Sequence, residues 1–114
     1  MKQTVAHRSP CPISRTLDIM GDKWTLVILR DITFFNRHTY AELAASREKI
    51  PTNLLADRLK RLVGAGLLEK VPYQDRPVRY RYQLTEAGQA IRPILMAMKK
   101  FGEQHLSGEG TKAP

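Results

Sequence analysis

The chain has 114 residues, 42% of them hydrophobic, and a formal net charge of +8. This length suits one domain with a modest core, and no apolar run reaches the roughly 20 residues that cross a bilayer. A single cysteine excludes an intrachain disulfide framework. The three histidines, His7, His38 and His105, lack the spacing of paired metal ligands, so we expect no cofactor and no metal.

The N-terminus has no apolar segment of the kind that directs secretion, so the sequence predicts a cytoplasmic protein without a membrane partner. Residues 1–10 are polar and are expected to form a flexible arm. Apolar residues then fall at Ile13, Leu17 and Met20, and this i, i+4, i+7 spacing predicts a helix that ends at Gly21.

A second helix is predicted directly after Asp22, which has the side chain of an N-cap residue. The segment up to Ile32 is apolar on nearly every side. We therefore expect this helix to be the buried centre of the domain, with Trp24 as a core aromatic.

Two further helices are separated by a short turn. The first is predicted over Tyr40–Ser46, and the second begins near Pro51, which suits a first helical position because it lacks an N–H. The second helix has an inward leucine stripe of Leu55, Leu59 and Leu62 and is expected to end at the Gly64–Gly66 pair. Its predicted outward face is polar: Asn53, Asp57, Lys60 and Arg61, with Arg58 on one flank.

The segments 67–71 and 79–84 are rich in strand-forming residues, and a turn cluster at 74–77 separates them. In the second segment Tyr80 and Tyr82 alternate with arginines, which predicts one packed face and one basic face. A helix pair followed by such a ribbon is a winged helix-turn-helix. This fold is mainly α with a small β-ribbon, and it places one helix in the major groove of DNA.

Thr85 is the predicted cap of a final helix that continues to Leu106 and is kinked at Pro93. Its apolar stripe is wider than one small domain requires. One interpretation is a core helix with a generous face. The other, which we favour, is that part of the stripe meets a second copy of the chain together with the first helix. The residues of this predicted homodimer interface are Ile13, Leu17, Ile94, Leu95, Met98 and Phe101. The domain is expected to span 11–106, followed by a disordered tail, 107–114.

Positive charge gathers on the predicted groove helix and ribbon, because residues 51–82 contain seven basic and three acidic side chains. Arginines and lysines there would neutralise phosphates, whereas Asn53 could pair bidentately with adenine. The predicted DNA contacts are Thr52, Asn53, Asp57, Arg58, Lys60, Arg61, Arg76, Arg79 and Arg81. For Asp57 three roles stay open: repelling phosphate, orienting Arg61, or accepting from a cytosine amine. The alternative is a solvated helix face with ordinary ion pairs such as Asp57 with Arg61.

Several motifs occur in a specific order: CPISRTLDIMGDKW at 11–24, ILRDI at 28–32, YAEL at 40–43, IPTNLLADRLKRLVGAGLLEK at 50–70 and YQLTEAG at 82–88, with Tyr73, Pro77 and Arg79 in the ribbon and Pro93 in the last helix. In this order and spacing, from Cys11 to about Gly102, the chain closely resembles the HxlR-type family of winged helix-turn-helix transcriptional regulators, relatives of the MarR type.

The resemblance implies a homodimer built from the first and last helices, an approximately palindromic double-stranded DNA operator, and a bacterial, nucleoid-associated repressor or activator. Such regulators often respond to electrophiles, quinones, aldehydes or oxidants, so the resemblance also implies a small-molecule or electrophile effector. The chain departs from the family at Pro51, Asn53 and Ala56, so its operator is expected to differ. Arg81 and Val63 stand where the family usually has glutamate, and Arg81 makes the ribbon more basic.

Some relatives sense oxidants through a cysteine at the position of Cys11, which makes this residue a candidate redox sensor. At the start of the first helix, and helped by Arg8 and Arg15, it would be a reactive thiol beside the dimer interface. The alternative, that this cysteine merely packs, stays open. Without a second cysteine, a disulfide switch would have to join two subunits or use a small thiol.

Other functions compete with this interpretation. A nuclease or other enzyme would need clustered carboxylates or a nucleophile with a base, and the sequence suggests neither, so we expect no enzymatic activity. A DNA-packaging protein would bind all duplexes equally, and a protein–protein module on this fold would bind none. The sequence instead predicts a sequence-specific regulator with helix 51–64 in the major groove and the wing, 73–80, on the flanking backbone.

Overall fold

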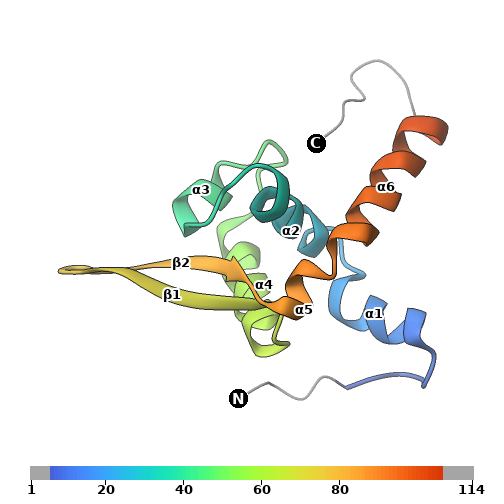
Figure 1. Ribbon diagram of the computed structural model, residues 1–114, viewed down its shortest axis with the longest axis horizontal. Helices are drawn as coiled ribbons and strands as arrows, with labels where there is room; N and C mark the ends of the chain where they lie inside the picture. The colour runs from blue at the N-terminus through green and yellow to red at the C-terminus, as the bar shows by residue number, and fades with distance from the viewer. Residues whose placement is uncertain (1–5, 107–114) are drawn as a thin grey trace.

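The computed structural model describes residues 6–106 and is mainly helical with one antiparallel hairpin (Figure 1). The elements in chain order are α1 Pro12–Met20, α2 Thr25–Phe34, α3 Tyr40–Ala44, α4 Thr52–Gly64, β1 Leu68–Asp75, β2 Val78–Leu84, α5 Glu86–Gln89 and α6 Arg92–His105. The predicted fold class, mainly α with a small β-ribbon, is confirmed. The predicted tail, 107–114, lies outside the described residues, as do residues 1–5.

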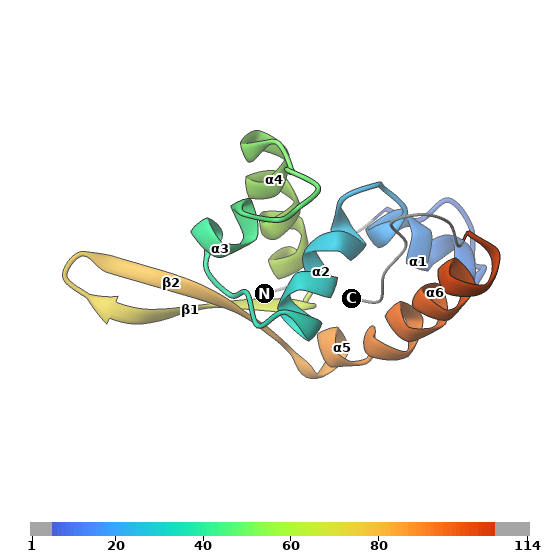
Figure 2. The same cartoon turned by 90° about the horizontal axis from the view of Figure 1, so that it is seen from above.

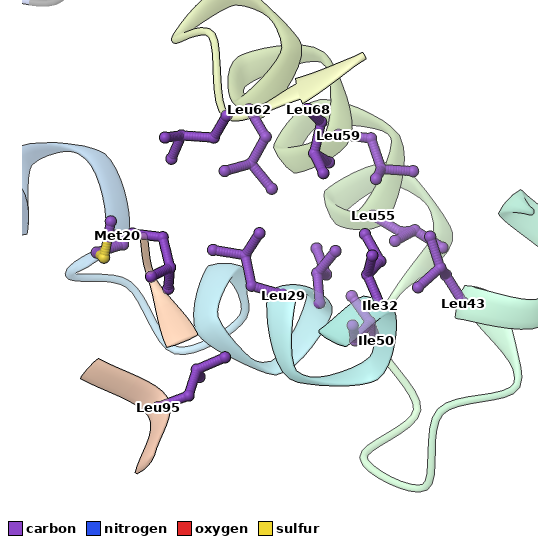
Figure 3. Packing of buried hydrophobic residues seen from close by; sticks show 13 residues of the cluster. Met20, Leu29, Ile32, Leu43, Ile50, Leu55, Leu59, Leu62, Leu68 and Leu95 are labelled. Carbon is purple, nitrogen blue, oxygen red and sulfur yellow. The ribbon is translucent and has the colours of Figure 1, made fainter. Parts of the chain in front are cut away.

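The hairpin extends from one end of the molecule, and α1 and α6 lie at the opposite end (Figures 1 and 2). Helix α2 lies between them as the centre of the core, as its apolar sequence predicts. Ile28 and Leu29 have no exposed surface, and leucines of α3 and α4 pack on one side of α2 while Leu95 of α6 packs on the other (Figure 3). Trp24 is half-buried against the same cluster. Helix α2 therefore connects the two halves of the molecule.

The start of α2 differs from the prediction. The helix begins at Thr25 with Trp24 in the N-cap position, so Asp22 lies in the preceding turn. Its carboxylate still serves the helix end, because Oδ1 accepts from the N–H groups of Trp24 and Thr25 at 2.9 and 3.0 Å. Asp22 thus provides the acceptor for the N–H groups at the start of α2, although it lies two residues before the N-cap position.

Helix α3 begins where predicted, because Thr39 and Glu42 form a reciprocal capping box. It ends at Ala44, two residues before the predicted end, and Lys49 then adopts a left-handed φ of 55° in the turn. Helix α4 follows at Thr52, one residue later than predicted, with the proline in the N-cap position.

The end of α4 lies where the glycine pair predicts. Gly66 has a φ of 81°, a conformation that favours glycine. The N–H groups of Gly66 and Leu67 donate to the carbonyls of Val63 and Leu62 at 3.0 Å each. These are the two bonds of a Schellman motif, and they turn the chain directly into β1.

The hairpin is longer than predicted, because antiparallel pairing continues until Asp75 lies opposite Val78. The predicted packed face exists only at the base, where Tyr82 and Leu84 pack against the core. Tyr80 is 40% exposed, which corrects the expectation that it packs. The strands extend beyond the helices there, so no core lies beneath this tyrosine.

The final helix is broken in two, which corrects the predicted single helix. Thr85 caps α5 as expected, since its Oγ1 accepts from the Gly88 N–H at 3.1 Å. Helix α5 nevertheless ends at Gln89 and α6 begins at Arg92. Pro93 explains the break, because it has no N–H for the carbonyl of Gln89 and its ring would collide with that carbonyl. Within the described residues, no helix combines the length and the apolarity needed to cross a membrane.

Candidate nucleic-acid interface

One face of α4 is turned away from the core. The leucines on the inner side, Leu55, Leu59 and Leu62, are at most 1% exposed, so the residues opposite them face solvent. The four residues that the helical period places outward are all exposed: Asn53, Asp57, Lys60 and Arg61. Thr52 and Ala56 are exposed as well. Packing of the inner stripe therefore sets the direction of the polar one.

Arg58 differs from the other predicted DNA contacts on this helix. Its side chain is only 16% exposed, and its Nε donates to Asp22 Oδ1 at 3.1 Å. Its Nη1 donates to Asp57. The guanidinium is therefore bonded within the protein, between α4 and the turn before α2. The ionic partner of Asp57 is thus Arg58, whereas the alternative interpretation of this helix face named Arg61.

Asp22 receives donors from two helices. Besides the two N–H groups at the start of α2, its carboxylate accepts from Thr25 Oγ1 and from Arg58. Burial on its own raises the pKa of Asp22, but these hydrogen bonds outweigh it and lower the pKa to about 2. The carboxylate is therefore charged at neutral pH, and it ties the middle of α4 to the N-terminus of α2.

A second ionic contact holds the turn that precedes α4. Arg30 of α2 donates to both oxygens of Glu48, through Nη1 at 2.7 Å and Nη2 at 2.8 Å. The bond from Arg30, supported by one from Ser46, lowers the pKa of Glu48 to about 2 against the opposing effect of burial. On its other side Arg30 donates to the buried carboxylate of Asp31. Helix α2 and the turn before it thus hold the helix-turn-helix at two points.

Sequence reasoning missed the residues that position α4. The Arg30–Glu48 contact joins positions 18 apart and the Asp22–Arg58 contact joins positions 36 apart, so helical periodicity carries no signal for either. The one available signal was an acidic residue just before an apolar helix. It indicated that Asp22 caps α2, but it did not indicate that Asp22 also binds Arg58 of α4.

The hairpin presents its arginines to solvent. Arg76 lies in the tip, Arg79 and Arg81 follow on β2, and all three are exposed. The base of β2 is fixed to the connection between α2 and α3, because the Tyr82 N–H donates to the carbonyl of His38 at 2.7 Å. The hairpin, α3 and α4 form one half of the molecule, and α1 and α6 form the other (Figure 2).

Apolar side chains are exposed in the α1 and α6 half. The five large ones predicted for the interface are Ile13 at 73%, Leu17 at 51%, Ile94 at 36%, Met98 at 51% and Phe101 at 58%. Leu95 is different, because it is only 7% exposed and belongs to the core. Together with Ile91, the N-cap residue of α6, Leu95 faces inward, so its assignment to the interface is corrected.

Cys11 is exposed and is the N-cap residue of α1, so its predicted place at the start of the first helix is confirmed. The two arginines expected to support it are bonded elsewhere. Arg8 Nε donates to Asp18 Oδ1 at 2.6 Å, and Arg15 Nε donates to a backbone carbonyl at 3.0 Å. Residues 8 and 9 are thereby tied to α1.

A short helix, a turn, an exposed polar helix and a two-stranded ribbon, assembled on a buried helix, define the winged helix-turn-helix class. The chain belongs to the HxlR-like helix-turn-helix family, whose model matches residues 19–109. The family resemblance found in the sequence is confirmed.

Proteins similar to this chain are transcriptional regulators. An uncharacterized HTH-type transcriptional regulator of Mycobacterium tuberculosis is 37% identical over 94 residues, which cover 82% of this chain and 58% of that relative. The chain thus spans little more than half the length of this relative. None of these similarities indicates a catalytic family.

Two solved structures show the same fold. PA1607 is 32% identical and matches with a TM-score of 0.82 over 94% of this chain and 73% of that one. The redox regulator HypR in its reduced form is 27% identical, with a TM-score of 0.72 over 85% of this chain and 95% of HypR.

Proposed function

We propose that the protein regulates transcription by binding specific double-stranded DNA, with α4 in the major groove and residues 73–80 of the hairpin on the flanking backbone. The observation that carries this proposal is the exposed face of α4. The leucine stripe and the Asp22–Arg58 contact hold this helix against the core, and the Arg30–Glu48 contact holds the turn before it. In this face, Thr52 and Asn53 in the first turn precede the cations Lys60 and Arg61. Recognition helices read bases near their N-terminus, so this order suits the task.

The residues divide into base-reading and phosphate-binding groups. Asn53 carries an amide that can donate to and accept from an adenine edge. Lys60 and Arg61, with the arginines of the hairpin, would neutralise phosphates and so supply affinity without sequence preference. We assign Arg58 a positioning role, because its guanidinium is already bonded to two carboxylates.

The proposed DNA-binding form is a homodimer built from α1 and α6. Monomeric proteins rarely expose many large apolar side chains together, and here six occur on these two helices, five of them predicted interface residues and the sixth Met96. Two copies related by a two-fold axis would bind an approximately palindromic operator, with half-sites about one helical turn apart. We place this dimer in the cytoplasm, at the nucleoid.

Selection from a random duplex library at about 150 mM salt, which suppresses most non-specific binding, tests the proposal. We expect enrichment of one two-fold-symmetric motif. Binding without enrichment would instead identify a DNA-packaging protein. No binding to any duplex would favour a protein–protein module on this fold. Either of these outcomes overturns the proposal.

We further propose that Cys11 makes the regulator responsive to oxidants or electrophiles. Its exposure at the start of α1, the helix that carries the exposed Ile13 and Leu17, supports this proposal, as does the similarity to the redox regulator HypR. With diamide as oxidant, two Cys11 thiols, one from each protomer, would lose two protons and two electrons to diamide and join as a disulfide. Diamide should release wild-type protein from its operator but not Cys11→Ser. Equal release of both would end the sensing proposal.

A further inference from the structure

A cleft of about 430 Å³ lies between α4 and the hairpin. It is lined by Tyr40, Ala56, Lys60, Val63, Lys70 and Tyr82. These residues come from α3, α4, β1 and β2, so the cleft forms only when the helix pair and the hairpin are folded against each other. Two of the six are lysines and none is a carboxylate, so the cleft suits an anion.

The two lysines come from different walls of the cleft, Lys60 from α4 and Lys70 from β1. Among the described residues, neither forms an ion pair. The nearest acidic neighbours in sequence are occupied. Asp57 is bonded to Arg58, and Glu69, on the opposite face of β1, accepts from a glutamine of β2 at 3.2 Å.

Three tyrosines contribute to the structure of the cleft. Lys70 Nζ lies 4.6 Å from the centroid of the Tyr80 ring, a cation–π distance. The hydroxyl of Tyr40 donates to the Thr52 carbonyl at 3.0 Å, which ties α3 to the first turn of α4. Burial raises the pKa of Tyr82, with a further contribution from Tyr40, so the Tyr82 hydroxyl keeps its proton and can act as a donor.

We propose that this cleft clamps one phosphate of the DNA backbone between Lys60 and Lys70, with the Tyr82 hydroxyl as a third donor. The inference rests on the proposed DNA-binding function and adds Lys70 and Tyr82 to it. A phosphate held from the helix and the hairpin at once ties both elements to one backbone position. The clamp therefore sets the angle at which α4 enters the groove. Base contacts alone would come from α4 and would not fix the hairpin relative to the DNA.

The test replaces backbone phosphates of the selected duplex, one at a time, by neutral methylphosphonate. Each contacted phosphate that is neutralised should lower the slope of log affinity against log salt by about 0.9 for wild-type protein. Lys60→Gln and Lys70→Gln should each reduce the effect of methylphosphonate at the same single position, and the double variant should abolish it there. Lys100→Gln, on exposed α6, is the matched control and should retain the wild-type pattern.

Convergence of the two variants on one phosphate is the decisive result, because a free anion in the cleft would show no dependence on backbone position. Lys70→Arg keeps a cation both over Tyr80 and toward the phosphate, so it should retain the wild-type pattern. If the two lysine variants affect different positions, or none, the clamp is wrong while the regulator stands. If wild-type protein binds no duplex, the proposed function itself fails.

Discussion

Helices α4 and α6 are built alike on the inside and differ on the outside. Each packs apolar side chains toward α2: Leu55 and Leu59 on α4, and Leu95 on α6 with Ile91 at its N-cap. Beyond that stripe α4 exposes amide and charged side chains, whereas α6 exposes large apolar ones. Amphipathicity alone therefore says only that a helix packs. The residues outside the stripe indicate the next partner, a polyanion for α4 and an apolar protein surface for α6.

The largest effect is expected where a charge is placed on the apolar side of α6. Met98→Asp should raise the dissociation constant of the proposed homodimer at least ~100-fold, because burying an unpaired charge costs about 3 kcal/mol or more. Sedimentation velocity over a concentration series measures this change.

Met96→Asp is the matched control for that variant. Met96 is 43% exposed, close to the 51% of Met98, but the two side chains point about 160° apart around α6. The control should dimerise like wild type. Equal weakening by both variants would mean that charge anywhere on α6 disrupts association, and would remove the assignment of one face to the interface.

On α4 the expected effect is a change in sequence preference. Asn53→Ala should reduce discrimination at one base pair of each half-site by about 1–3 kcal/mol, because the bidentate amide is lost. Repeating the duplex selection with the variant measures this. Arg61→Ala should instead weaken all duplexes alike. An unchanged motif for Asn53→Ala would show that another residue reads the base.

Features that depend on residues close together in sequence were predicted correctly, whereas contacts between distant residues were not. The inner stripe of α4 was predicted correctly, because helical periodicity is a local property that residues 55–62 display by themselves. The partner of Arg58 was not, because Asp22 lies 36 positions away and nothing in the spacing joins them. A long arginine on a helix flank has the same sequence signature whether it contacts phosphate or a carboxylate of its own chain.

The wide stripe of α6 shows a second limit. Ile94, Leu95 and Met98 all belong to it, yet only Leu95 is buried in the protomer. Periodicity gives the direction of a side chain only to within the width of the stripe. The packing of α6 against α2 decides which part becomes core, and the direction of α6 follows from the break at Pro93, whose extent the sequence did not reveal.

Arg58 and Lys60 provide a smaller but more specific comparison within α4. Arg58→Met should lower the free energy of unfolding by about 1–2 kcal/mol, since a hydrogen-bonded partner of Asp22 is lost, and should leave the salt dependence of DNA binding unchanged. Lys60→Met should do the reverse, with little change in stability and a salt slope reduced by about 0.9. Urea unfolding and salt titrations of operator binding measure the two quantities. A reduced salt slope for Arg58→Met would return this residue to the phosphate contacts.

The smallest expected effect is a loss of stability at low pH, and it should differ between the α4 half and the α6 half of the molecule. Asp22 and Glu48 have pKa values of about 2 in the folded protein, below their ordinary values of 3.8 and 4.5. The folded state therefore favours their charged forms, so their stabilising contribution is complete above about pH 4.5 and is lost as the pH falls toward 2. Solvent screening limits the size of this contribution, because the Glu48 side chain is 34% exposed.

Glu48→Gln should accordingly lose less stability than wild type between pH 6 and pH 3, as measured by urea midpoints. Both carboxylates hold α4 and its turn to α2, whereas α6 meets α2 through the apolar Leu95. Acid in this range should therefore loosen α4 before α6, and amide hydrogen exchange at pH 3 should show protection falling first in residues 52–64. A simultaneous loss of protection in both helices would mean that the two ionic contacts act only on global stability and do not position α4 separately.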